Sequence, residues 1–261
     1  MKPMKPLVIV TVFNRYRETA ATLAALAETT DLEQIELVVV DNGSTDGAGD
    51  VVDKWRDGVG EKTGFTTWPA VRHLPENIGI PRALNLAIIN YRQIGQPVVK
   101  WDNDVVCLTP GWVEAVMDFI ECQRQARPVA LVRAWRDGTQ IQSAWREAWG
   151  GFSFYVPQQK LGYAVWYTGE FVDRVGHFDV LAPNHLYGFE DVLICYKAGL
   201  MGWVELMWEG WKIQDIQRSS ALRGKKEHVE EMRPLSRARL KALQNGGPVY
   251  TGPDGQPMDG H

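Results

Sequence analysis

The chain has 261 residues, of which 45% are apolar and 23% are charged, and its formal net charge is −4. This composition is that of a globular protein, and the length suits one large domain with an appended subdomain better than two independent domains. The net negative charge excludes a general electrostatic affinity of the whole chain for nucleic acid or anionic membranes, although local basic patches remain compatible with it.

Cysteine usage and the N-terminus lead us to expect a cytoplasmic protein, in the host cytoplasm if the protein is viral. Cys107, Cys122 and Cys195 are far apart and lack the spacing of a metal site, which is typical of proteins in a reducing compartment. Residues 1–6 lead directly into a strand-like run, without the apolar stretch of a signal peptide. Because no apolar run reaches the roughly 20 residues of a spanning helix, we also expect no transmembrane anchor.

Strand-like and helical patterns alternate along the first half of the chain. Continuous β-branched runs predict strands buried on both faces, and segments with apolar residues at three- to four-residue spacing predict helices. The predicted strands are residues 7–13, 35–41, 71–74, 98–101 and 129–134, and the predicted helices are 18–28, 46–55, a segment that starts at Pro81, and 111–125. This alternation predicts an α/β fold with a mostly parallel central sheet and flanking helices.

The alternation fades after residue 134. Aromatic residues crowd into a segment with several glycines, and residues 188–200 predict a loop that leads into a helix. Aromatic faces stack on sugar rings, but the eleven tryptophans mainly indicate core packing. Beyond Ser219 the chain is basic, which is compatible with a solvated helix, a lid over phosphate groups or a contact with nucleic acid.

Two predicted strands end in acidic turns. Residues 41–47 have the sequence DNGSTDG after one strand, and residues 102–104 have the sequence DND after another. Ligands of open α/β sheets bind beyond the carboxyl ends of the strands, so the two turns can converge on one ligand. Carboxylates in this arrangement suit a divalent cation that already bridges two phosphates, which favours a nucleoside diphosphate as the ligand. The alternative is that these acids only cap turns and helices.

Five segments together resemble the GT-A-type glycosyltransferases, and the family-2 group most closely. They are 9–15 (IVTVFNR), 38–46 (VVVDNGSTD), 76–85 (ENIGIPRALN), the DND at 102–104, and the pair formed by 175–179 (VGHFD) and 188–191 (GFED). The resemblance spans residues 7–218. It implies a GT-A fold, Rossmann-like, with a smaller C-terminal acceptor-side subdomain. On this basis residues 1–134 would form the nucleotide-sugar-binding half, 135–243 the acceptor-side half of the same domain, and 244–261 a flexible tail.

The resemblance also implies a set of donor and metal contacts. Asp41 would read the nucleotide base, Asp104 would ligate Mn²⁺ or Mg²⁺, and Asp102 would contact the ribose or the metal. Many relatives place a His near the register of Asp215, so this carboxylate is a further candidate ligand, whereas His177, His185 and His228 fall outside that register and are expected to be structural. The full set of expected donor contacts is Thr11, Phe13, Asn14, Arg15, Asp41, Ser44, Asn77, Arg82, Asp102 and Asn103.

Glu190 and Asp191 are the candidates for proton transfer and for contact with the acceptor. Transfer of a sugar with inversion needs a carboxylate that takes the proton of the acceptor hydroxyl. By resemblance Asp191 is the expected base and Glu190 the expected contact to the acceptor. The alternative is an acidic first turn that only complements the helix dipole.

The sequence therefore predicts a metal-dependent, inverting glycosyltransferase that uses a nucleoside-diphosphate sugar, with UDP favoured, and a glycan or other hydroxyl acceptor. One alternative is a phage-type enzyme that glycosylates a hydroxylated base in DNA. Another is a catalytically silent protein that binds sugar nucleotides. A nucleotidyltransferase is disfavoured, because residues 11–15 lack the Gly-rich basic loop that cradles a triphosphate.

Overall fold

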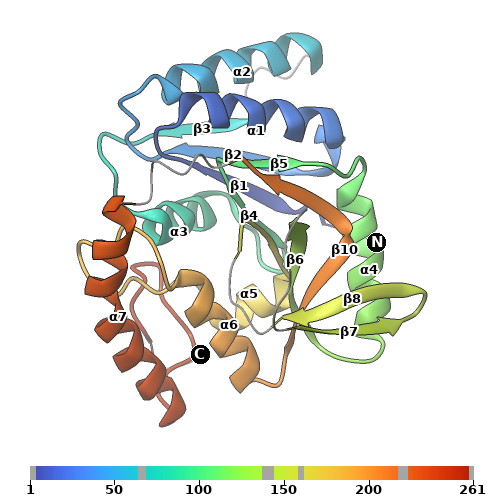
Figure 1. Cartoon of the computed structure of the whole chain (residues 1–261), viewed down its shortest axis with the longest axis vertical. Coiled ribbons are helices and arrows are strands. Elements are labelled where there is room, and N and C mark those ends of the chain that lie inside the picture. The colour runs from blue at the N-terminus through green and yellow to red at the C-terminus, as the bar shows by residue number, and fades with distance from the viewer. Residues whose placement is uncertain (1–3, 64–68, 137–143, 158–161, 217–222, 259–261) are drawn as a thin grey trace.

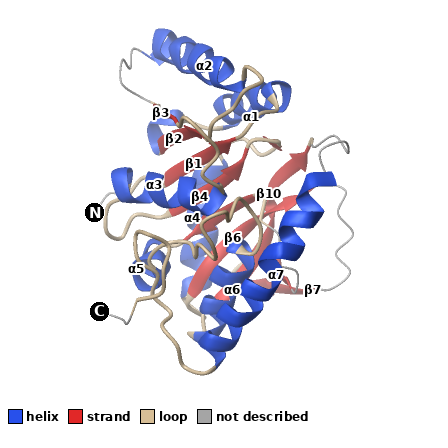
Figure 2. Ribbon diagram, turned by 90° about the vertical axis from the view of Figure 1, so that its left-hand side faces the viewer, coloured by secondary structure: helices blue, strands red, loops and turns tan. Residues whose placement is uncertain are grey.

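The computed structural model describes residues 4–63, 69–136, 144–157, 162–216 and 223–258. One sheet runs through the molecule and helices pack around it (Figures 1 and 2). The elements of the first half are β1 (Leu7–Val12), α1 (Tyr16–Thr29), η1 (Leu32–Gln34), β2 (Glu36–Asp41), α2 (Ala48–Thr63), β3 (Ala70–His73), α3 (Ile80–Tyr91), β4 (Val98–Asp102), β5 (Val105–Cys107) and α4 (Trp112–Arg124). Those of the second half are β6 (Val129–Arg136), β7 (Ala144–Trp149), β8 (Phe152–Pro157), β9 (Ala164–Tyr167), α5 (Gly169–Val175), α6 (Glu190–Leu200), β10 (Val204–Asp215) and α7 (Arg223–Gln244).

The sheet changes character between its two halves. The strand order is β3-β2-β1-β4-β9-β6-β10-β8-β7, with β5 paired to β10. The four strands β3, β2, β1 and β4 are parallel, so their carboxyl ends lie at one edge. Strand β9 is antiparallel to both β4 and β6, and the β7–β8 hairpin is antiparallel as well. The predicted α/β fold with helices around a central sheet is confirmed. The parallel strands β1 to β4 lie in the first half of the chain, where the sequence shows alternating strand and helix patterns.

Strand β1 shows why its sequence has no polar face. All six of its residues are buried, and alternate side chains enter two different hydrophobic cores. Val8, Val10 and Val12 pack with α1, α2 and α4, whereas Leu7 and Ile9 pack with α3, α5 and α6. A continuous apolar run is what a strand needs when helices cover both faces of the sheet.

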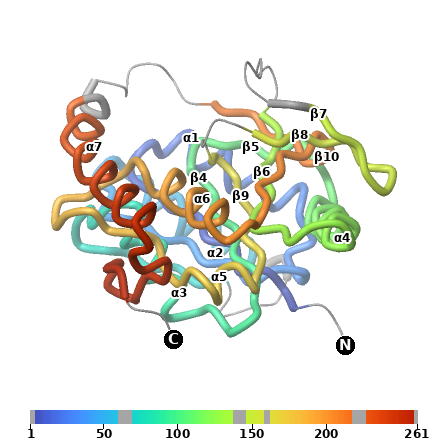
Figure 3. Tube along the Cα trace, turned by 90° about the horizontal axis from the view of Figure 1, so that it is seen from below, coloured from blue at the N-terminus to red at the C-terminus, as the bar shows by residue number. Residues whose placement is uncertain are grey.

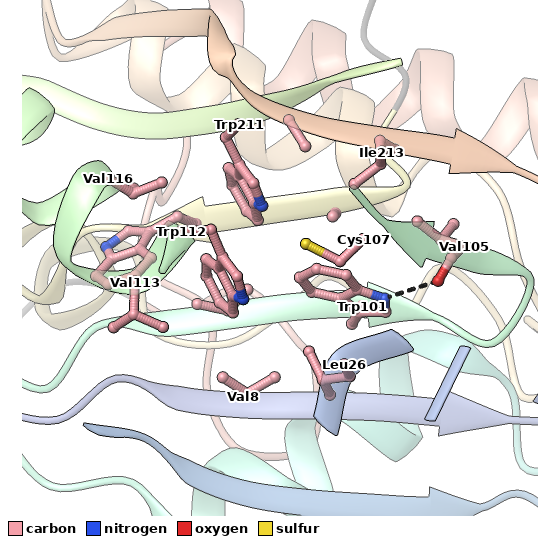
Figure 4. Close-up of a cluster of buried hydrophobic side chains, with 14 of the residues drawn as sticks. Val8, Leu26, Trp101, Val105, Cys107, Trp112, Val113, Val116, Trp211 and Ile213 are labelled. Carbon is pink, nitrogen blue, oxygen red and sulfur yellow. Dashed lines mark hydrogen bonds between the residues drawn. The ribbon is translucent and has the colours of Figure 1, made fainter. Parts of the chain in front are cut away.

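A cluster of tryptophans joins the two halves of the sheet (Figure 4). Trp112 of α4 stacks on Trp211 of β10, with 5.0 Å between ring centroids, and contacts Trp101 of β4 at 5.3 Å. The Trp101 indole donates a hydrogen bond to the carbonyl of Val105. These side chains are fully buried, which explains much of the aromatic content as core packing.

Buried charges tie the C-terminal part of the described chain to α6 and to the segment before it. Helix α7 lies beside α6, on the side of the molecule opposite α4 and the β7–β8 hairpin (Figures 1 and 3). Asp179 accepts from Lys197 of α6 at 2.6 Å and from Arg239 of α7 at 2.8 Å. Lys197 also bonds the hydroxyl of Thr251, which is fully buried although composition alone suggests a flexible tail there. None of the described helices combines the length and apolar character needed to cross a bilayer.

Candidate active site

A cavity of about 660 Å³ opens at the carboxyl ends of β1 and β4 and faces the first turn of α6. Its wall comes from segments that are far apart in the sequence. The lining residues are Thr11, Val12, Phe13, Asn14, Arg15, Asn42, Asn77, Ile80, Lys100, Asp102, Asn103, Asp104, Gly162, Tyr163, Leu186, Tyr187, Gly188, Glu190, Asp191 and His228. Both the acidic strand end of β4 and the Glu190–Asp191 pair therefore reach one cavity.

Asn14 joins the two acidic turns. Its backbone N–H donates to Ser44 Oγ at 2.8 Å, and its side-chain oxygen accepts from the backbone N–H of Thr45 at 2.8 Å. Its carbonyl accepts from the amide of Asn103 at 3.0 Å. The turn after β2 and the turn after β4 are thus held against the same residue.

Backbone strain is concentrated around this cavity. Within the described part of the chain, three residues other than glycine have positive φ, namely Asn14 (55°), Arg15 (65°) and Phe189 (68°). The first two line the cavity, and Phe189 directly precedes the Glu190–Asp191 pair. Left-handed backbone costs roughly 1–3 kcal/mol for such residues and is typical of functional sites. The strain at Arg15 is accompanied by an ion pair between its guanidinium and Asp104.

Gly79 allows the wall of the cavity to close. Its φ is +91°, and a Cβ atom there would lie 2.1 Å from the carbonyl oxygen of His185. The start of α3 can therefore approach the segment before α6 only with glycine at this position. The glycine of the predicted ENIGIPRALN motif has this physical role.

Lys100 is a buried cation that lies next to three of the acidic residues. Its Nζ is 3.0 Å from Asp191 Oδ2, 3.6 Å from Asp102 Oδ1 and 3.8 Å from Glu190 Oε1. Burial by itself would lower the pKa of Lys100, but these three carboxylates outweigh burial and raise the pKa above its ordinary value. Desolvation, together with the negative charges around it, raises the pKa of Asp102 to about 7 in spite of the nearby lysine.

Glu190 and Asp191 occupy the first turn of α6 but have different surroundings. Asp191 accepts from Lys100 through Oδ2 and from the hydroxyl of Tyr167 through Oδ1, at 3.0 and 3.2 Å. Glu190 is only 5% exposed, and its Oε2 atom has no hydrogen-bond partner among the described residues. Burial is the largest cause of the raised pKa of Glu190. One carboxylate is therefore held firmly, and the other presents an unsatisfied oxygen beside the cavity.

Asp41 ends β2 next to a histidine. Its Oδ1 accepts from the backbone N–H of Ser44 at 3.0 Å, and its Oδ2 is 2.9 Å from His73 Nδ1. His73 Nε2 is 3.1 Å from Asp53. Carboxylates only accept, so His73 can donate to both when it is protonated, and the bond to Asp41 is the main cause of its raised pKa. Asp41 is not among the residues that line the cavity, whereas its neighbour Asn42 is.

The structure brings most of the predicted donor contacts to the cavity, and four residues of the predicted set lie elsewhere. Thr11, Phe13, Asn14, Arg15, Asn77, Asp102, Asn103 and Asp104 line it, together with Glu190 and Asp191. Ser44 lies outside the lining but accepts from the backbone N–H of the lining residue Asn14, and Asp41 is the chain neighbour of the lining residue Asn42. Arg82 donates to the carbonyls of Ile78 and Ala182, and Asp215 pairs with Arg136 at 3.3 Å.

Sequence reasoning missed several residues of the site. Lys100 carries a visible signal, because a charged residue inside an otherwise apolar strand must be paired when the strand is buried. Tyr163, Tyr187 and His228 carry no such signal, since they arrive from loops and from α7. His228 was expected to be structural, and its Nε2 does accept from the backbone N–H of Leu186 at 3.1 Å, but the residue also lines the cavity.

The carboxylates suit a divalent cation that takes further ligands from its substrate. Asp104 and Asp102 offer the hard oxygen ligands that Mg²⁺ and Mn²⁺ prefer. No group of three or more His, Cys, Asp or Glu side chains in the described ranges is arranged to hold a metal by itself. Mg²⁺ is commonly bound by one or two carboxylates plus phosphate oxygens, so this donor set fits a cation that arrives with a diphosphate.

Comparison with known proteins agrees with this geometry. The model of the family described as "Glycosyl transferase family 2" matches residues 7–173. No curated protein matches the chain by sequence. The fold resembles that of the mannosyltransferase PcManGT from Pyrobaculum calidifontis in complex with GDP-Man and Mn²⁺, with a TM-score of 0.62, 17% identity and coverage of 93% of this chain and 65% of that chain.

Two further solved structures show the same fold. GalNAc-T7 with UDP, GalNAc and Mn²⁺ has a TM-score of 0.61 at 16% identity, and the alignment covers 83% of this chain and 44% of that chain. Residues 1–349 of S. aureus TarS give a TM-score of 0.60 at 18% identity, with coverage of 90% of this chain and 65% of that chain. The chain thus spans less than two thirds of the length of each of these proteins.

Proposed function

This chain belongs to glycosyl transferase family 2, and from that premise we propose that it transfers a sugar from a nucleoside diphosphate to an acceptor hydroxyl. One observation carries the proposal. The carboxylates of the turn after β4 and those of the first turn of α6 line the same cavity, although about ninety residues separate them in the sequence. Donor-side and acceptor-side chemistry can therefore act on one pair of substrates.

The donor occupies the side of the cavity formed by β1 and β4. Asp104, assisted by Asp102, would hold Mn²⁺ or Mg²⁺, which neutralises the charge that grows on the diphosphate leaving group. Arg15, now paired with Asp104, presents donors that match phosphate oxygens. Relatives of similar fold are described with GDP-Man or with UDP, so both bases belong in the test.

Our preference for a UDP-type donor depends on Asp41. A carboxylate at this strand end can accept the imide N–H of uracil, and each carboxylate oxygen accepts more than one hydrogen bond. The bonds from Ser44 and His73 therefore leave Asp41 with acceptor capacity. His73 and Ser44 would orient the carboxylate for this contact.

The acceptor hydroxyl would bind between the donor and α6. Asp191 takes the hydroxyl proton as the acceptor oxygen forms its bond to the anomeric carbon and the bond from that carbon to the diphosphate breaks. The attack occurs on the face opposite the leaving group, which gives inversion. Glu190 Oε2 would accept a hydrogen bond from a second hydroxyl of the substrate. A buried carboxylate oxygen without a hydrogen-bond partner is costly, and this bond would remove the cost.

A glycan or other hydroxyl compound is the acceptor class that we propose, in preference to a base in DNA. Part of the positive charge of the basic C-terminal stretch is neutralised by ion pairs within the fold. Arg239 is buried against Asp179, and Arg233 pairs with Glu230 at 2.6 Å. The buried Arg239 is therefore not available for a phosphate backbone. No specific feature of the cavity favours an extruded base.

A ligand panel tests the proposal without knowledge of the acceptor. Thermal unfolding is measured with UDP- and GDP-sugars, each with and without Mn²⁺, followed by detection of nucleoside diphosphate released by transfer of the sugar to water. We expect a rise in melting temperature that requires both the donor and Mn²⁺, and slow donor hydrolysis. Binding without hydrolysis would instead favour the catalytically silent alternative, and the absence of both would refute the proposal.

A further inference from the structure

The buried ammonium of Lys100 has a specific set of partners. It donates to Asp191 Oδ2 and to the carbonyl of Gly162, each at 3.0 Å. An ammonium has three N–H groups, and the remaining one lies within reach of Asp102 Oδ1 and Glu190 Oε1, at 3.6 and 3.8 Å. Lys100 is 2% exposed and still lines the floor of the cavity.

Tyr167 holds the other oxygen of the same carboxylate. Its hydroxyl donates to Asp191 Oδ1 at 3.2 Å, and the residue is 1% exposed. Lys100 and Tyr167 lie on β4 and β9, which are paired antiparallel strands, with Val98 opposite Tyr167 and Val165 opposite Lys100. Asp191 comes from α6, so two side chains of the rigid sheet hold one side chain of a helix.

The packing around Asp191 leaves little room for another position. A Cβ atom at Gly162 would lie 3.0 Å from Asp191 Oδ1 and 2.5 Å from a methyl group of Val165. The carboxylate is therefore enclosed by the sheet on one side and by the Gly162 backbone on another. A carboxylate held at both oxygens has a defined direction toward the cavity.

We infer that Lys100 and Tyr167 are positioning residues that fix the Asp191 carboxylate for proton transfer, and that Lys100 also links it to the donor-side Asp102. This inference rests on the proposed function. In the reaction, the acceptor O–H bond breaks, its proton moves to Asp191, and the acceptor oxygen forms the new bond to the sugar. Lys100 and Tyr167 exchange no proton in this step; they keep the receiving oxygen within reach of the hydroxyl.

The conservative test is Tyr167→Phe, which removes one hydroxyl and leaves the buried ring. With donor hydrolysis as the assay, we expect kcat to fall roughly 10-fold, because one of two hydrogen bonds to a charged group is lost. The affinity for nucleoside diphosphate with Mn²⁺ should stay within about twofold, since Tyr167 does not contact the donor side. Tyr155→Phe is the matched control, because its hydroxyl bonds the carboxylate of Glu209 outside the cavity.

The second test uses chemical rescue of Lys100→Ala. We expect a loss in kcat of roughly 100-fold, as for a displaced catalytic group, and partial recovery when propylamine is added at constant ionic strength. The amine can enter because Lys100 lines the cavity, and tetramethylammonium, which has no N–H, should not restore kcat. Lys197→Met controls for the loss of a buried lysine, since Asp179 keeps its pair with Arg239.

The outcomes separate this inference from the proposed function. Loss of kcat in Tyr167→Phe with unchanged nucleotide affinity, together with amine rescue of Lys100→Ala, supports it. Wild-type kcat in Tyr167→Phe overturns the inference, and this variant decides the question if Lys100→Ala does not fold. An equal loss of kcat in Lys197→Met overturns the role of Lys100. If the wild-type protein hydrolyses no donor, the proposed function fails, and the inference fails with it.

Discussion

The N-terminal half, which we propose binds the donor, and the C-terminal half, which we propose binds the acceptor, deliver their cavity residues by different routes. On the donor side, β1, β2 and β4 are parallel neighbours, and the residues that follow each strand meet at one edge. On the acceptor side, Glu190 and Asp191 arrive on the first turn of a helix, and Tyr187 and His228 arrive from a loop and from α7. The sheet there is mixed, so no common strand direction gathers the residues.

The two halves are also stabilised by different interactions at the cavity. The donor edge depends on backbone topology and on Asn14, which bonds both turns. The acceptor edge depends on side-chain hydrogen bonds and charge, because Lys100 and Tyr167 reach from β4 and β9 to Asp191 of α6. The buried tryptophans of β4, α4 and β10 then hold the two halves together. Substitutions in each region should therefore affect donor binding, kcat and stability differently.

The largest effect is expected from Asp104→Ala on the donor side. Without this carboxylate the cation would lose the protein ligand that we propose for it, and kcat/KM should fall by roughly 10⁴-fold because the leaving group is no longer neutralised. Calorimetry should also show that nucleoside diphosphate binding no longer depends on Mn²⁺. Asp57→Ala, at an exposed position of α2, is the control. Unchanged activity of Asp104→Ala in the presence of metal would contradict the metal assignment.

Asp191→Asn should separate the two halves functionally. The amide cannot take the proton, so we expect kcat to fall by roughly 10³-fold while the affinity for the nucleoside diphosphate with Mn²⁺ is retained. Stopped assays of product formation and calorimetry of donor binding give the two readouts. Asp118→Asn on the exposed face of α4 should behave like the wild type. A variant that still transfers at the wild-type rate would show that Asp191 is not the base.

Trp112→Ala should weaken the junction between the halves. Trp112 is fully buried between Trp101, Trp166 and Trp211, and its removal leaves a large cavity. We expect a loss of about 3–5 kcal/mol in the free energy of unfolding, measured by urea denaturation. Trp149→Ala, where the side chain is 47% exposed, should cost far less. Equal losses in the two variants would argue against the cluster as the main junction.

The smallest effect concerns His73 and Asp41. The pKa of His73 is raised above 6.5, chiefly by its bond to Asp41, so the pair stabilises the folded protein fully below that pH. The stabilisation is lost as the pH rises through the raised pKa. Because the His73 side chain is 42% exposed, the contribution should be under about 1 kcal/mol. His73→Gln should flatten the dependence of unfolding free energy on pH as the pH rises from about 6.5, as followed by urea denaturation. An unchanged slope would rule out this linkage.

Much of the donor half could be predicted because its signals are local. The predicted strand at 98–101 corresponds to β4 (Val98–Asp102), and the predicted helix at 111–125 corresponds to α4. The acceptor half was less accessible. Strand β10 mixes buried and half-buried positions without a strict alternation, and no strand was predicted there. The burial of its side chains depends on neighbours on both faces of a mixed sheet. Those neighbours are distant in the sequence, so a short sequence window does not contain the information.

The parallel strands, the two acidic turns and the helix start at Glu190–Asp191 follow from local sequence, because hydrophobic periodicity and turn chemistry are properties of neighbouring residues. Long-range packing brings Lys100 beside three carboxylates, pairs Asp41 with His73, and gives Arg82 and Asp215 partners outside the cavity. Apart from the one between Lys100 and Asp102, these contacts join residues that lie tens of residues or more apart. Charge pairing at such separation depends on where the sheet places each strand, and that placement is a property of the whole fold.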